Sequence, residues 1–321
     1  MKTRPVPLLL GLLAIAIPLS LLAGQVWIDP LAPRTVNALP ILFELRAPRA
    51  ALALVIGAGL GAGGAAMQGY LRNPLADPGL FGIAPMAALG AVLSFATGLS
   101  FALPVFALMG AAAAMAGLGL IAAGGEGGRS TTLFTLAGLM LASLAGALTS
   151  LMISLAPNPF ALSEIVTWLM GSLEDRSWAD VGIAAPPTAL GLILLARAGP
   201  ALDALTLGED TARSLGFRPR RLLGLMVLGV GLVVGAGVAV AGIIGFVGLM
   251  VPHLVRPFTD QRPSALLVPS ALGGALLLLV ADCLCRVLPL SGGELRLGIA
   301  LSLIGAPFFL HLLLRLRRAL P

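Results

Sequence analysis

Three long stretches of this sequence contain no charged side chain and no histidine. They cover residues 80–123, 131–163 and 222–252. A helix needs about 20 residues to cross the hydrocarbon core of a bilayer, so each stretch can supply at least one crossing. A soluble domain carries about 25% charged residues, whereas this chain has 11% and a mean hydropathy of +1.03. Lipid must therefore be the solvent for much of the surface.

The apolar pattern predicts an all-α membrane protein with about ten transmembrane helices. The eighth segment is short for a full crossing and is interpreted as a half-helix beside a re-entrant stretch. The first segment resembles a signal peptide, but the many later spans favour a retained helix. The spans are expected near residues 6–24, 50–70, 80–98, 101–123, 131–155, 180–197, 222–242, 244–258, 264–284 and 297–315.

The basic residues predict the orientation. With the N-terminus in the cytoplasm, 14 of the 20 Lys and Arg residues fall on the cytoplasmic side, as the positive-inside rule requires. Trp27, Trp168 and Trp178 then fall on the outer side, where aromatic side chains anchor at the interface. A short interfacial helix carrying Trp168 is expected within 156–172. The net charge of +6 follows from this topology and predicts no nucleic-acid partner.

The sequence lacks the residues that would energise transport from within the chain. Coupled carriers bury an ionisable relay near the midplane, and the uncharged stretches offer none, so an ion-coupled carrier or channel is disfavoured. Lys2 is the only lysine, which excludes a phosphate-binding loop ending in Lys. Cys283 and Cys285 are interpreted as packing residues. No catalytic residue, metal site or cofactor is expected.

Two segments on the cytoplasmic side break the helical pattern. Arg72–Gly79 contains two prolines and a glycine, which predicts either a tight turn or a fixed bend beside the inner mouth of a pathway. Leu207–Gly216 predicts a short helix opened by acidic residues and closed by Gly216, and Pro219 predicts a second helix start. This loop either sets topology alone or docks a cytoplasmic partner.

Three arginines are expected on the outer side, although the positive-inside rule favours basic residues on the cytoplasmic side. Arg46 and Arg49 share a helix face, and Arg286 lies at the outer end of the ninth span. Local pairing is one explanation, with Asp282 and Arg286 four residues apart and Glu44 near Arg46 or Arg49. The other is a contact with acidic residues of an external partner, since guanidinium groups pair well with carboxylates.

Several motifs together resemble the FecCD family, whose members are permeases of type II ABC importers for ferric siderophores, haem and cobalamin. The resemblance runs from about residue 40 to 315. It is carried by Arg46-Ala-Pro-Arg49, Gly64-Ala-Ala-Met-Gln68, Arg72-Asn-Pro-Leu-Ala-Asp-Pro-Gly79, Leu207-Gly-Glu-Asp-Thr-Ala-Arg-Ser-Leu-Gly216 and Gly242-Ile-Ile-Gly-Phe-Val-Gly-Leu-Met-Val-Pro-His253.

The resemblance implies a single permease domain over residues 1–321, with a coupling loop at about 200–221 and an inverted repeat of spans two to five against seven to ten. It implies a homodimer in the bacterial inner membrane, two ABC ATPase subunits below it and a periplasmic substrate-binding protein above it. The permease itself is then no enzyme. The expected cargo is a ferric siderophore, with cobalamin or haem as alternatives.

The resemblance also assigns roles to individual residues. Arg46, Arg49 and Arg286 would contact glutamates of the binding protein. The inner gate or pathway would involve Asn73, Pro74, Ser130, Thr131 and Thr132. Coupling to the ATPase would involve Leu207, Gly208, Glu209, Asp210, Ala212, Arg213, Leu215 and Gly216.

Overall fold

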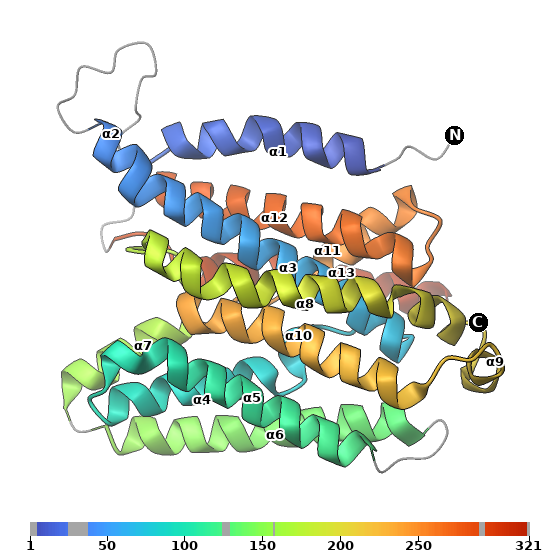
Figure 1. The fold of residues 1–321 in the computed structure, drawn as a ribbon. Coiled ribbons are helices and arrows are strands. Elements are labelled where there is room, and N and C mark those ends of the chain that lie inside the picture. Colours follow the sequence, from blue (N-terminus) through green and yellow to red (C-terminus); the bar gives the residue numbers. More distant parts are fainter. Residues whose placement is uncertain (1–4, 25–37, 124–128, 157, 289–292, 320–321) are drawn as a thin grey trace.

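The computed structural model describes residues 5–24, 38–123, 129–156, 158–288 and 293–319. Within these ranges the chain is helical and contains no strand. The longer helices lie roughly parallel or antiparallel in one bundle (Figure 1). The main helices are α1 (Pro5–Leu22), α3 (Ala47–Leu71), α4 (Ile83–Ala96), α5 (Leu103–Ala123), α6 (Arg129–Ser154), α8 (Trp178–Leu205), α10 (Pro219–Ala241), α11 (Val247–Val255), α12 (Pro263–Val287) and α13 (Leu297–Ala319).

Each of the ten predicted spans corresponds to one of these helices, which confirms the predicted fold class. Eight of them are long and apolar enough to cross a membrane. The half-helix predicted for the eighth span is α11, with nine residues. The helix α4 is also shorter than the expected span, because Gly82 and Gly98 have positive φ values of 79° and 72° and end the helical path on either side.

Short elements connect the long helices. A π-helical turn (Ile41–Arg46) follows α2 (Ala38–Pro40) and leads into α3. Single 3₁₀ turns precede α4 and α5 and follow α11. The helix α7 (Pro159–Leu169) is the short helix predicted around Trp168, and Asn158 caps its first turn through a bond from the Ala161 amide.

Helix α3 is the central packing element, and glycine allows its neighbours to approach it at backbone distance. A Cβ atom at Gly57 or Gly61 would collide with backbone carbonyls of Gly274 and Ser270 on α12. A Cβ atom at Gly64 would collide with the carbonyl of Gly248 on α11. Close backbone approach of this kind is how membrane helices gain packing contacts where lipid offers no hydrophobic driving force.

The two halves of the bundle share one pattern, which agrees with the predicted repeat. In each half a long helix, α3 or α10, ends at a residue with positive φ, and an irregular stretch leads to a short helix, α4 or α11. The residue before each short helix, Gly82 or Phe246, is also left-handed. Two long helices then follow. The helices α3 and α10 run in opposite directions (Figure 1), as an inverted repeat requires.

The connection between α8 and α10 differs from the prediction in two respects. The first predicted helix is present as α9 (Glu209–Ser214). The second is not a separate short helix, because Pro219 occupies the first turn of α10, which continues without a break to Ala241. The helix α8 also runs further than predicted, to Leu205. A single short helix therefore projects at this end of the bundle (Figure 1).

Candidate functional site

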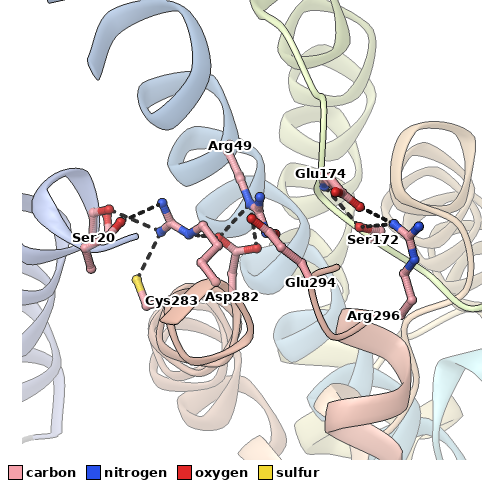
Figure 2. Close-up of polar contacts among 10 residues, drawn as sticks. Ser20, Arg49, Ser172, Glu174, Asp282, Cys283, Glu294 and Arg296 are labelled. Carbon is pink, nitrogen blue, oxygen red and sulfur yellow. Dashed lines mark hydrogen bonds and ion pairs between the residues drawn. The ribbon is translucent and has the colours of Figure 1, made fainter. Parts of the chain in front are cut away.

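A buried charge network occupies the end of the bundle predicted to face outward. Arg49 of α3 donates from Nε to both carboxylate oxygens of Asp282 on α12, at 2.9 and 3.1 Å, and from Nη2 to Glu294 at 2.6 Å. Asp282 is fully buried and Arg49 is 9% exposed. Figure 2 shows Arg49 between the two carboxylates. A charge at this depth requires such pairing.

Arg286 completes the network from the other side of Asp282. Its Nε lies 3.2 Å from Asp282 Oδ2, which confirms the local pair predicted from their spacing. Its terminal nitrogens donate to the backbone carbonyls of Ser20 and Ala23 and to Cys283 Sγ. The predicted alternative that Arg49 pairs with Glu44 is wrong, because Asp282 and Glu294 are the partners of Arg49.

Arg46 and Arg286 together hold the end of α1. Arg46 Nη1 donates to the carbonyls of Leu21 and Leu22 at 2.9 and 2.8 Å, and Arg286 reaches the carbonyls on either side of them. The last carbonyls of a helix have no partner within the helix and carry partial negative charge. Two guanidinium groups from other elements satisfy them here, which is a role that sequence reasoning missed.

A cavity of about 470 Å³ opens beside this network and is shared by all three predicted docking arginines. Its remaining charged lining comes from Glu294 and from the loop at Glu174, Asp175 and Arg176. The structure thus brings Arg46, Arg49 and Arg286 together, although the last is more than 200 residues from the others. Two of the three are buried rather than solvent-facing.

The predicted coupling residues lie together on α9 and its flanks, at the opposite end of the bundle (Figure 1). Arg213 pairs with Glu209 at 2.9 Å across one helical turn. Gly208 and Gly216 flank the helix with φ values of 103° and 87°, which only glycine adopts without strain. The apolar Leu207 and Leu215 are 64% and 59% exposed, whereas Ala212 is buried. Asp210 is exposed.

The bend after α3 is built as a fixed structure. Arg72 ends α3 in the left-handed region, and Asn73 Oδ1 accepts a bond from the Leu75 amide. Asp77 is buried and accepts a bond from the Gly79 amide at 2.7 Å. The predicted pathway residues Asn73 and Pro74 are exposed. This geometry confirms the predicted turn, and a cavity of about 340 Å³ lies against it, lined also by the stretch before α11.

The structure places the predicted gate residues Ser130, Thr131 and Thr132 in the first turn of α6. The side chains of Ser130 and Thr131 lie outside the described part of the structure, and Thr132 is exposed. Cys285 is buried, as expected of a packing residue. Among the described residues, no group of three or more His, Cys, Asp or Glu side chains is arranged to hold a metal ion.

A second cavity at the end predicted to face outward, of about 610 Å³, was not anticipated from the sequence. It lies between α7, the start of α5 and the loop after α7, and Trp168 and Arg176 both face it. Arg296 also lines it and forms an ion pair with Glu174 (Figure 2). Burial lowers the pKa of the Arg176 guanidinium, but a group with so high an ordinary pKa stays charged.

Comparison with known proteins identifies the family of this bundle. The model of the FecCD transport family matches residues 12–315. The chain belongs to this family. It is 38% identical to the vitamin B12 import system permease BtuC of Vibrio cholerae over 96% of this chain and 93% of that one. It is 40% identical to the Fe(3+) dicitrate permease FecD of Escherichia coli over 86% of both.

A solved structure shows the same fold. It is described as an inward-facing conformation of a metal-chelate type ABC transporter, shares 32% identity and aligns with a TM-score of 0.87 over 96% of this chain and 97% of that one. Like other members of this transport family, the chain is a multi-pass membrane protein that serves as a permease subunit. The family membership places the chain in an ABC importer with a dimeric arrangement.

Proposed function

We propose that this chain is the permease subunit of an ABC importer that moves a metal chelate across the bacterial inner membrane, with its N-terminus in the cytoplasm. A ferric siderophore is the first expected cargo, and cobalamin or haem are the alternatives. Two copies would form the pathway between them. Two ATPase subunits would supply the energy, because the chain has no phosphate-binding loop of its own.

One observation carries this proposal: two polar sites lie at opposite ends of an otherwise apolar bundle. The arginine network occupies one end and α9 the other (Figure 1). The long helices between them, such as α5 and the membrane part of α10, carry no charge. A large chelate could pass such a bundle without being trapped by a strong binding charge.

The helix α9 is the proposed contact with the ATPase. The exposed leucines at 207 and 215, on either side of it, provide apolar contacts, and the Glu209–Arg213 pair provides a polar one. Closure of the ATPase dimer would push on α9 and tilt α8 and α10, which flank it directly. Ser130, Thr131 and Thr132, together with Asn73 and Pro74, are proposed to form the inner gate.

The periplasmic binding protein is proposed to dock over the outer arginines. Arg46, Arg49 and Arg286 line one cavity with Glu294, so a glutamate of the partner would enter an existing network of carboxylates and guanidinium groups. Arg46 is the accessible member, since it is only half-buried. Long-range attraction of this kind speeds docking and weakens with salt.

Co-expression with the ATPase and the binding protein tests the proposal. A four-chain complex should copurify, hydrolyse ATP faster when the loaded binding protein is added, and take up the chelate into vesicles. Arg213→Glu should lower uptake severalfold while the amount of subunit in the membrane stays unchanged, and Arg221→Glu serves as a charge-matched control outside α9. Stable chelate uptake by the permease without any ATPase would contradict the proposal.

A further inference from the structure

Two nitrogen donors of residues that line the 610 Å³ cavity have no acceptor. Trp168 Nε1 and Arg176 Nε are both buried, and neither has a hydrogen-bond partner among the described residues. They belong to one unit, because the Arg176 guanidinium carbon lies 5.0 Å from the centre of the Trp168 ring. A buried donor without an acceptor costs about 1–3 kcal/mol, so such groups are rare unless something else satisfies them.

The nearby carboxylates are engaged elsewhere or are exposed. Glu174 pairs with Arg296, and Asp180 closes the capping box of α8 with Ser177. Glu164 also borders the cavity and is exposed to solvent, which screens its charge. In the described part of the chain no carboxylate forms an ion pair with Arg176. Asp175 also lines the cavity and is exposed, and like Asp180 and Glu174 it acts on the charge of Arg176 only from beyond ion-pair distance. The guanidinium therefore has no carboxylate in direct contact.

The aromatic wall supports the same conclusion. Phe95 packs edge-on against Trp168 at 6.2 Å between ring centres. The cavity is thus lined by two residues with unpartnered donors and by an aromatic wall, a mixture of polar and apolar groups that suits a small-molecule site.

We propose that this cavity binds a carboxylate of the transported metal chelate as the chelate enters the permease. The inference rests on the proposed function and narrows it to chelates that carry carboxylates, such as ferric citrate or haem. The guanidinium of Arg176 and the indole N–H of Trp168 would donate to the carboxylate oxygens, since both are donors only. The rings of Phe95 and Trp168 would contact the organic frame of the chelate.

The test is a binding titration on the full-length permease in lipid nanodiscs. Trp27→Phe with Trp178→Phe leaves Trp168 as the sole tryptophan, because the chain has three. The probes are gallium citrate, a redox-silent analogue of ferric citrate, and neutral trimethyl citrate. We expect a saturable change in Trp168 fluorescence with gallium citrate only. Arg176→Gln should weaken the apparent Kd by about tenfold, the loss of one charge-assisted hydrogen bond.

Matched variants separate the site from the fold. Arg176→Lys keeps the charge but lacks the planar fork, so an intermediate Kd is expected. Arg220→Gln removes an exposed arginine at the start of α10 and should leave the Kd unchanged. Equal responses to both probes, no response, or an unchanged Kd in Arg176→Gln would overturn the inference. If the complex still shows ATP-dependent uptake, only this inference fails; without such uptake the proposed function fails.

Discussion

Asp282 has no solvent exposure and forms ion pairs with two arginines from different parts of the chain. The carboxylate on α12 neutralises Arg49 on one side and Arg286 on the other, and Arg286 in turn caps α1. Removing a carboxylate from such a network leaves buried charges without compensation, which costs far more than the intact pair contributes. Arg49 and Arg286, two of the arginines proposed to dock the binding protein, therefore also hold three helices together.

Asp282→Asn is expected to lower the free energy of unfolding by about 3–5 kcal/mol, because both arginines lose their shared charge. Thermal unfolding of the detergent-solubilised protein measures the effect. Glu209→Gln, which breaks the solvent-facing pair of α9, should cost about 0.5 kcal/mol or less. Similar losses of unfolding free energy in the two variants would show that the buried network contributes no more to stability than a surface ion pair.

The buried carboxyl group of Asp77 should make the stability of the protein depend on pH. Burial raises the pKa of this carboxyl from 3.8 to about 6, against opposing bonds from the amides of Gly79 and Leu249. Because the folded pKa is raised, the stabilising contribution is complete below about pH 4 and is lost as the pH rises through 6. The loss amounts to about 3 kcal/mol, from roughly two pKa units.

The melting temperature between pH 4 and 7 measures this contribution. In the Asp77→Asn variant the melting temperature should fall less between pH 4 and 7 than in the wild type, because the asparagine amide does not ionise. Asp210→Asn, at an exposed position on α9, should keep the wild-type profile. A mutant profile that still falls in parallel with the wild type would assign the decline to another group.

Only part of this residue-level picture could be predicted from the sequence. The Asp282–Arg286 pair follows from a spacing of four on one helix. The contact of Arg49 with Asp282 joins residues 233 positions apart, and no local pattern encodes it. The orphan donors of Trp168 and Arg176 arise in the same way, from a loop folding over a helix. Their types and positions gave no signal in the sequence.

At the scale of elements, the glycines of α3 decide how closely the helices pack. Spans were predictable because bilayer thickness fixes the length of an apolar helix. The helices that pack against Gly57, Gly61 and Gly64 were not predictable from the sequence. Small residues allow close approach by many different helices, and no local pattern specifies which helix it will be. The structure selects α12 and α11.

Gly61→Ala should destabilise the bundle by about 1–3 kcal/mol, because the new methyl group meets the carbonyl of Ser270 and neither backbone can move aside cheaply. Gly146→Ala on α6 is the matched control, since its Cβ would meet nothing within 4 Å. There the change should be neutral or stabilising by up to about 1 kcal/mol. Thermal unfolding compares the two, and equal effects would argue against close α3–α12 packing.

At the scale of the whole molecule, the position of the uncharged helices is as informative about energy coupling as the position of the charged residues. The residues from 80 to 123 and from 222 to 252 carry no ionisable group, and these stretches build α4, α5, most of α10 and the first part of α11. A proton or sodium relay needs ionisable groups near the midplane. The polar sites instead lie at the two ends, where separate proteins can act on them.

This distribution predicts how uptake responds to the energy source. In proteoliposomes that hold the complex with ATP kept constant on the ATPase side, a protonophore should leave the initial uptake rate unchanged within error, because no group in the uncharged helices can carry a proton. Withdrawal of ATP should abolish uptake, and restoring ATP should restore it. If the protonophore stopped uptake at constant ATP, the bundle would have to contain a relay, and Asp77 and the Asp282 network would be the first groups to mutate.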